Sequence, residues 1–292
     1  MSKILIVTDS FAHFASQQFI HQNPMVTVVP NKISIAGKSY REGIDLLPED
    51  GLRLMQHQPY APLLTPPSEM EFAEVYGRLS RQCDGIISIH ASREICASYD
   101  NALAAARQFA GNSPIAVIDS QNICAGQGML VKAALKSIQK HARMDDMVRE
   151  VRGAIERIYS TYYVESVAYL QQNKIMSASH SSLSALLGVK PFLSVEHGHL
   201  NLTEKVRTRA QAIDRLVEFV TEFSDIEDVV ILQHKTYMSE QTRMIQDRLA
   251  VDFPNRHFPY TLYSASLASL IGTDATGVVI LEKEMEDFDD EF

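Results

Sequence analysis

The chain has 292 residues, 46% of them hydrophobic, and a formal net charge of −9. This length can bury one large or two medium cores, and no apolar run reaches the roughly 20 residues of a membrane helix, so we expect no stable membrane insertion. The negative charge argues against nucleic acid as the main partner, because phosphate binding needs a basic face.

The cysteines and the N-terminus point to the cytoplasm. The chain has an odd number of cysteines, Cys83, Cys96 and Cys124, and their spacing is not that of metal ligands. This predicts a reducing, cytoplasmic location and no metal site. At the N-terminus a single lysine precedes a four-residue apolar run that turns acidic. That pattern is typical of a first strand rather than of a signal peptide.

Strands alternate with helices over the first half of the chain. β-Branched apolar runs predict strands at residues 3–7, 25–29, 33–40, 85–89 and 115–118. Between them we expect helices near Phe11, from residue 48, at 69–82, from about 94, after the Gly126-Gln127-Gly128 turn to 141, and at 144–161. This alternation is typical of right-handed βαβ units around a parallel sheet.

The second half has a different pattern. We expect strands at 164–170, 229–234, 258–263 and 278–281, a hairpin from 192–195 and 199–202, and helices at 183–187, 207–223 and 240–253. Residues 267–276 read as a loop or short helix. The prediction is a two-domain α/β protein divided at residues 1–160 and 161–292. The first domain has a mainly parallel sheet flanked by helices, and the second has a mixed sheet with helices.

The turn after the strand at 85–89 is the first candidate site. Open α/β sheets bind ligands where a strand end meets a helix N-terminus, because free backbone N–H groups point into the crevice there. Ser92 lies in this turn and is expected either to cap the following helix or to hold an anionic group. His90, at the strand end, is either a satisfied, half-buried histidine or a ligand residue.

Other motifs give no catalytic assembly. The chain has no GxSxG, Walker, HExxH or first-strand GxGxxG motif. His197 and His199 share a strand face, but nothing nearby supplies further metal ligands. Residue chemistry alone therefore predicts a hydroxyl-lined crevice between two domains and no enzyme.

An ordered set of short segments resembles the DegV family, whose members bind fatty acids and in some bacteria present them to a kinase. The segments include Thr8-Asp9-Ser10, Tyr40 to Asp45, Thr65 to Ser68, Ile89 to Ser92, Gly126-Gln127-Gly128 and Leu186 to Pro191. The resemblance implies a long apolar tunnel near the domain interface. It also implies a bound carboxyl group surrounded by hydroxyls, an arginine and a histidine.

Several family positions differ in this sequence. Thr65 and Ser92 retain hydroxyls, and Ser98 replaces a threonine. Lys174 or Ile175 stands where the family has arginine, and Leu270, two residues before Gly272, stands where it has histidine. The resemblance thus implies a ligand site formed by Thr65, His90, Ser92, Ser98, Lys174, Leu270 and Gly272.

Four hypotheses about function follow. The first is non-enzymatic binding of a long-chain fatty acid, with no cofactor and with an acyl-kinase catalytic subunit as a possible partner. The second is a site rebuilt for a neutral or differently charged lipid, which Leu270 favours. The third is a phosphoryl-transfer component, by analogy with the dihydroxyacetone-kinase substrate domain, although no residue here supplies its covalent histidine. The fourth is a scaffold with a closed core.

Overall fold

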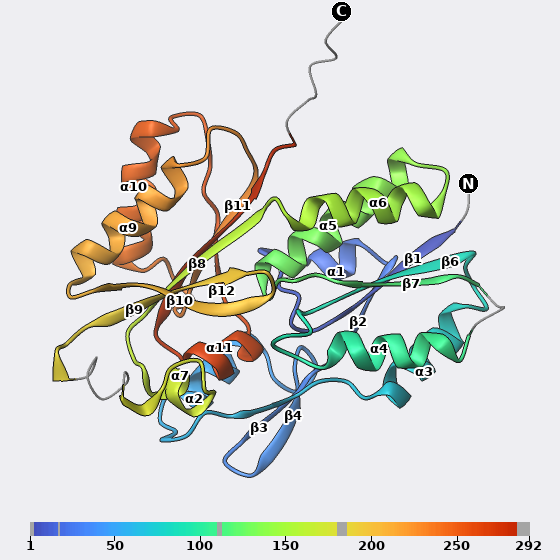
Figure 1. The fold of residues 1–292 in the computed structure, drawn as a ribbon, viewed down its shortest axis with the longest axis horizontal. Helices are drawn as coiled ribbons and strands as arrows, with labels where there is room; N and C mark the ends of the chain where they lie inside the picture. Colours follow the sequence, from blue (N-terminus) through green and yellow to red (C-terminus); the bar gives the residue numbers. More distant parts are fainter. Residues whose placement is uncertain (1–2, 17, 110–112, 180–185, 285–292) are drawn as a thin grey trace, which may run out of the picture.

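Two large sheets lie side by side in the computed structural model, which describes residues 3–16, 18–109, 113–179 and 186–284 (Figure 1). The first sheet is wholly parallel, as its apolar, β-branched strands predict, in the order β2-β1-β6-β7. Its strands are β1 (Ile4–Asp9), β2 (Val26–Val29), β6 (Gly85–His90) and β7 (Ile115–Asp119).

Helices cover both faces of this sheet (Figure 1). On one side lie α3 (Glu69–Leu79) and α4 (Ser98–Arg107), and on the other α5 (Ala125–Lys140) and α6 (Met144–Ile155). A capping box starts α3, since the Ser68 hydroxyl accepts the Glu71 N–H while the Glu71 carboxylate accepts the Ser68 N–H. A short helix, α1 (Phe19–Gln22), follows β1.

The second sheet is mixed, in the order β10-β9-β8-β13-β11-β12, with only β11 and β12 parallel. Its strands are β8 (Ile158–Val164), β9 (Lys190–Glu196), β10 (His199–Val206), β11 (Ile226–Gln233), β12 (Tyr260–Leu262) and β13 (Ala275–Glu282). Helices α9 (Arg209–Thr221) and α10 (Glu240–Asp252) cover one face (Figure 1). The predicted fold class, a parallel sheet followed by a mixed sheet, is confirmed.

A small antiparallel sheet, β4-β3-β5, was not predicted as a separate unit. The chain at 33–40 forms the hairpin of β3 (Lys32–Ile35) and β4 (Lys38–Arg41), turning through Ala36 and Gly37, both of which have positive φ. Strand β5 (Leu63–Thr65) forms its other edge. Helices α2 (Pro48–Met55) and α11 (Ala265–Ile271) pack nearby, and α7 (Ala168–Gln172) packs on α11 (Figure 1).

Several expected element boundaries were wrong. No helix begins near Phe11, because the Asp9 carboxylate accepts the Phe11 N–H and forms a turn. Helix α4 begins at Ser98 rather than near 94, because the Ser92 carbonyl first accepts two N–H groups in a separate turn. The helix expected to reach 161 ends at Ile155, and β8 begins at Ile158. The helix expected at 183–187 falls mostly outside the described residues.

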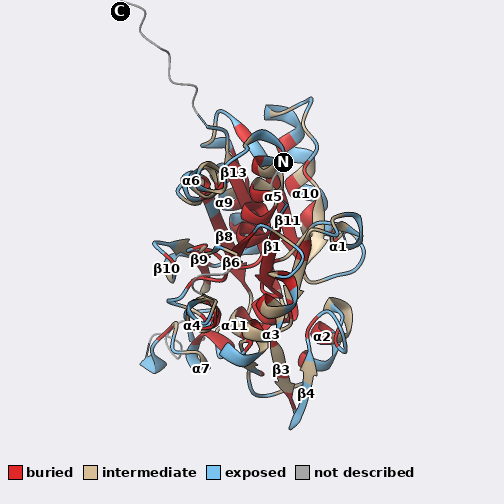
Figure 2. Cartoon of the chain, turned by 90° about the vertical axis from the view of Figure 1, so that its right-hand side faces the viewer, coloured by how far each residue is buried: buried red, intermediate tan, exposed pale blue. Residues whose placement is uncertain are grey.

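Helix α5 lies between the two large sheets and joins their cores. It contacts β1 and β6 of the first sheet and β8 and β13 of the second. Gly126 and Gly128 lie inside this helix rather than in a turn before it. One hydrophobic cluster accordingly includes buried side chains from α5 and from both sheets, and buried residues concentrate where the sheets meet (Figure 2). The proposed division at about residue 160 remains a prediction, and β8 crosses that position.

Gly128 makes the close approach of α5 possible. A Cβ at this position would lie 2.0 Å from the His13 backbone carbonyl oxygen. We expect Gly128→Ala to lower the free energy of unfolding by about 2–4 kcal/mol, because backbone must move to relieve the overlap. Denaturant unfolding of the purified variant measures this change.

Gly153 in α6 supplies the matched control. It is exposed, and a Cβ there meets nothing within 4 Å. Gly153→Ala should leave stability unchanged or raise it by up to about 1 kcal/mol through helix propensity. Equal effects of the two substitutions would contradict the packing argument.

Candidate functional site

A buried hydrogen-bond chain runs across the carboxyl ends of β1 and β6. His90 Nδ1 lies 3.0 Å from the Asp9 carboxylate, and Nε2 lies 2.7 Å from the Ser88 hydroxyl. The Tyr76 hydroxyl lies 2.7 Å from the same serine oxygen, and the ring edge of Phe72 packs on His90. Both ring nitrogens of His90 are therefore engaged within the first sheet and α3, which is the arrangement of a satisfied core histidine.

Ser92 lies where the first sheet meets the second. Its side chain is fully buried, and its hydroxyl donates a 2.7 Å hydrogen bond to the carbonyl of Gly198, in the β9–β10 turn. The same oxygen accepts the Glu94 N–H at 3.3 Å. Ser92 caps no helix, because α4 begins six residues later with Ala97 as its N-cap. Ser98, also buried, has its hydroxyl 3.3 Å from the Cys96 sulfur.

Leu270 and Lys174 lie near each other through α7 and α11. The Asn173 side-chain amide donates to the carbonyls of Ser269 at 2.8 Å and Leu270 at 3.1 Å. The Leu270 side chain packs against the shared hydrophobic cluster. Lys174 is exposed, whereas its neighbour Ile175 packs against that cluster. The apolar residue of the pair therefore faces the core and the cationic one faces solvent.

Gly272 and Thr65 lie on the same side of the molecule as Leu270. Gly272 has φ +96°, and its position lies beside the Tyr169 ring. It lines a cavity of about 300 Å³ with Tyr169 and Met55. Thr65 is exposed on β5, which contacts α11, and the preceding Leu64 packs against the shared cluster.

The predicted site residues thus form two groups. One contains His90, Ser92 and Ser98 at the strand ends of the first sheet, and the other contains Thr65, Lys174, Leu270 and Gly272 around α11. Among the described residues, no hydrogen bond joins the groups directly. The shared hydrophobic cluster reaches both, because Cys96, Leu170 and Ile271 are buried members of it.

Sequence reasoning missed a buried carboxylate, Glu42, which lies between the ends of β1 and β4 and helix α11. Its oxygens accept the Ser10 hydroxyl at 2.8 Å, the Ser266 N–H at 2.8 Å and the Ser266 hydroxyl. Asn31 completes the cluster through its N–H to Ser10 and its side-chain amide to Ser266. In the sequence, Ser10 stands out only as part of the Thr8-Asp9-Ser10 segment. Its hydrogen-bond partners Asn31 and Glu42 lie 21 and 32 positions away, which no local pattern connects.

Burial raises the pKa of Glu42, and the nearby Asp9 charge adds to this effect, while the hydrogen bonds oppose it. The hydrogen-bond partners that the structure describes for Glu42 include no cation, so none of them offers a positive charge to offset the effect of burial on its pKa. The folded state therefore holds the proton more tightly than the unfolded chain. As pH rises from the unfolded value, near 4.5, through the folded value, stability falls, because the folded state binds more protons there.

Glu42→Gln should remove this pH dependence. We expect the unfolding free energy of the variant to become larger, relative to that of wild type, as pH rises above about 4.5, since the amide never ionises. Denaturant unfolding across pH 4 to 8 measures it. Glu74→Gln, on the exposed face of α3, is the control, and a parallel response of both variants would contradict the assignment.

The thiols offer no activated nucleophile. Burial raises the pKa of Cys96 to about 11 and that of Cys124 to about 12. Across the described ranges, no three or more His, Cys, Asp or Glu side chains are grouped so as to hold a metal ion. The described helices likewise include none that is long and apolar enough to span a membrane.

Comparison with known proteins assigns the family. A family model described as an uncharacterised protein, DegV family, matches residues 3–283. The chain belongs to the DegV family. The DegV domain-containing protein TTE1491 of Caldanaerobacter subterraneus subsp. tengcongensis is 31% identical over 285 residues, covering 97% of this chain and all of that protein.

Solved DegV structures share the fold. The fatty acid binding DegV family protein SAG1342 from Streptococcus agalactiae superposes with a TM-score of 0.86 at 24% identity, covering 97% of this chain and all of that one. A DegV family protein from Eubacterium eligens loaded with heptadecanoic acid gives 0.80 at 15% identity, covering 96% and 100%.

Proposed function

We propose that this DegV family member binds a long-chain fatty acid and acts as a carrier or presentation protein rather than as an enzyme. The observation that carries the proposal is the continuous apolar cluster between the two large sheets. The fatty acid binding DegV protein from Streptococcus agalactiae and the heptadecanoic acid-loaded one from Eubacterium eligens support it. A cluster built from both halves of the chain can admit an apolar chain by a small separation of the sheets.

Partly exposed apolar side chains around this cluster are the candidate lining of an acyl tunnel. Each packs against the buried core while keeping some accessible surface. They come from β5, the turn before α4, the segment after α7, β10 and α11; they are Leu64, Ile95, Ile175, Leu200, Leu202 and Leu270. About sixteen methylenes at about 0.8 kcal/mol each would supply most of the binding free energy.

The head group needs only a few donors. An unpaired buried carboxyl would cost several kcal/mol, so at least one hydroxyl must reach it. Ser92 is the leading candidate, because its buried hydroxyl lies at the interface, with Ser98 nearby and Thr65 on the α11 side. His90, Lys174, Leu270 and Gly272 complete the proposed surroundings of the ligand.

A second candidate, a neutral head group, is favoured by two side chains. Leu270 packs against the core at the position of the family histidine, and Lys174 is exposed. An ester, alcohol or protonated acid would need no cation. We keep an acyl-kinase catalytic subunit as the candidate partner and the cytoplasm as the expected location.

Native mass spectrometry of freshly purified protein is the direct test. We expect a bound mass that, on release, is identified as a long-chain fatty acid. A neutral lipid would instead support the second candidate. Protein that carries nothing and binds no added lipid would contradict both and leave a scaffold with a closed core.

Substitution of Ser92 tests the head-group assignment. Ser92→Ala should weaken stearate binding by about 1–2 kcal/mol, the usual size of a lost buried hydrogen bond, in a direct titration. Ser194→Ala is the matched control, because the Ser194 hydroxyl bonds to Glu196 within the β9–β10 hairpin. Unchanged affinity of the Ser92 variant would remove this residue from the site.

A further inference from the structure

The β9–β10 hairpin extends well beyond its own sheet. Strand β9 pairs with β8 only at residues 192–194, and β10 is the edge strand. The tip of the hairpin, residues 195–200, therefore does not pair with β8. It reaches toward the end of β6 (Figures 1 and 2). Its apolar side chains Val195 and Leu200 pack against the cluster between the large sheets. The tip thus covers part of the proposed acyl-binding interior.

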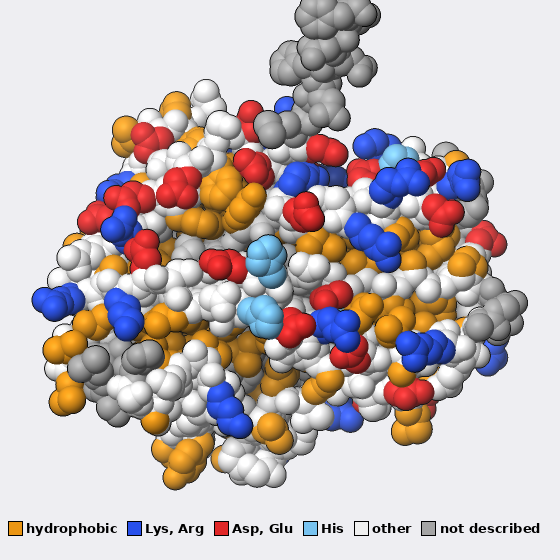
Figure 3. All heavy atoms as spheres, in the orientation of Figure 1, with side chains coloured by type: hydrophobic (Ala, Val, Ile, Leu, Met, Phe, Trp, Pro, Cys, Tyr) orange, Lys and Arg blue, Asp and Glu red, His pale blue; other side chains and the backbone are white. Residues whose placement is uncertain are grey.

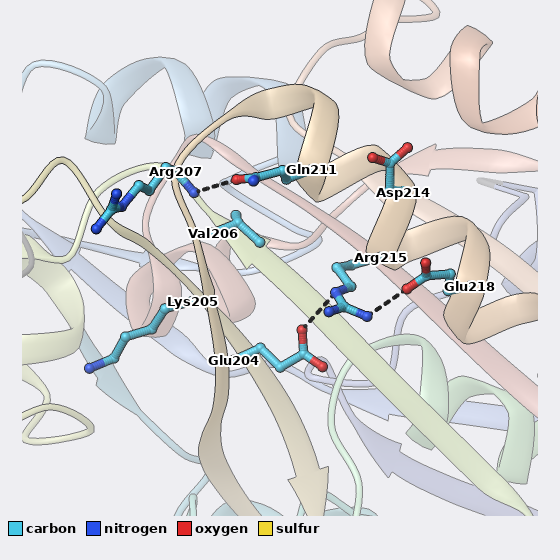
Figure 4. A pocket seen from close by; sticks show the side chains of 8 residues that line it. All are labelled: Glu204, Lys205, Val206, Arg207, Gln211, Asp214, Arg215 and Glu218. Atoms are coloured by element: carbon cyan, nitrogen blue, oxygen red, sulfur yellow. Dashed lines mark hydrogen bonds and ion pairs between the residues drawn. The ribbon is translucent and has the colours of Figure 1, made fainter.

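The base of the hairpin is held by backbone pairing of β9 with β8, and exposed ion pairs to α9 lie beside it. Arg215 of α9 lies 3.2 Å from the Glu204 carboxylate of β10 and 2.7 Å from that of Glu218 (Figure 4). Val206, beside them, is buried. Arg215 lines the groove between β10 and α9, and both of its ion-pair partners are side chains of the same groove. We therefore interpret the groove as a contact between the hairpin and α9 rather than as a ligand site.

The tip is held to the first sheet more lightly. Across the described residues its polar contacts there are the Ser92–Gly198 hydrogen bond and an exposed ion pair, 3.7 Å, between His199 and Glu94. Histidine and charged side chains lie together at the centre of this face (Figure 3). Gly198 has φ +83°, and a Cβ there would lie 2.6 Å from the Ser92 hydroxyl oxygen. Only glycine lets the turn approach this closely.

We propose that the β9–β10 tip is a flap latched by the Ser92 hydroxyl, and that the lipid head group opens it by competing for that hydroxyl. The inference rests on the proposed function. The Ser92 hydroxyl can donate one hydrogen bond, and in the structure the Gly198 carbonyl accepts it. A bound carboxylate or carbonyl oxygen that accepts this hydrogen bond instead removes the latch, while the base keeps the hairpin attached.

The competition lowers the apparent affinity, because ligand binds only the fraction of molecules whose latch is open. Gly198→Ala should push the tip off Ser92 and leave the hydroxyl free. We expect this variant to bind stearate about five-fold more tightly, the factor that corresponds to one net hydrogen bond. Association should also be faster. Ser92→Ala releases the same latch but also loses the ligand contact. Because a hydrogen bond to a carboxylate is stronger than one to a backbone carbonyl, the loss outweighs the release and the affinity should fall.

Hydrogen exchange of the tip amides, residues 195–200, provides the structural readout. In lipid-free protein, Ser92→Ala should speed exchange about five-fold, and Ser194→Ala, in the same hairpin, should not. In wild type, saturating stearate should also speed tip exchange, whereas simple burial by ligand would slow it. This arm needs no variant, so the proposal stays testable even if Gly198→Ala does not fold.

The outcomes separate the two proposals. Wild-type protein that binds no stearate overturns the proposed function, and the ligand-opened flap with it. Stearate binding with unchanged or slower tip exchange overturns the flap alone, as does a Gly198→Ala variant that folds but binds stearate no more tightly than wild type. Opposite affinity changes in Gly198→Ala and Ser92→Ala, with faster tip exchange on binding, support it.

Discussion

The burial of α5 between two sheets is the constraint on which this structure depends. A helix that packs against both sheets must be apolar around much of its surface, and the first turn of α5 is buried even at Gln127. Gly128 lets the helix come within contact of the His13 backbone. Because this one helix belongs to both cores, the apolar interior is continuous from the first sheet to the second.

This continuity shapes what the protein can bind. Polar groups collect at the carboxyl ends of the first sheet, but most of them bond to one another, as Asp9, Ser88 and His90 do. The polar groups at the junction include Ser92, which bonds to the hairpin, and the Glu42 cluster, which bonds to α11. A ligand at the junction meets much apolar surface and few donors, which suits a lipid better than a polar metabolite.

The junction also joins parts of unequal rigidity. Glu42 ties the small sheet to Ser10 and Ser266 through three hydrogen bonds to one carboxylate, all buried. The hairpin tip, in contrast, is tied by one serine hydroxyl and an exposed ion pair. Lightly tied segments open at lower free energy than buried networks, so an opening between the sheets would begin at the hairpin.

The sequence by itself determined the alternation of strands and helices and the parallel and mixed sheets, because each depends on local periodicity. The family resemblance added the chemistry of the ligand only as an expectation. The tertiary structure alone decided that His90 is satisfied by Asp9 and Ser88, that Lys174 is exposed while Ile175 packs inward, and that Ser92 meets Gly198. It also revealed Glu42 bonded to Ser266, 224 positions away. These contacts join residues far apart in the chain, and packing of the whole molecule, rather than local sequence preference, selects them.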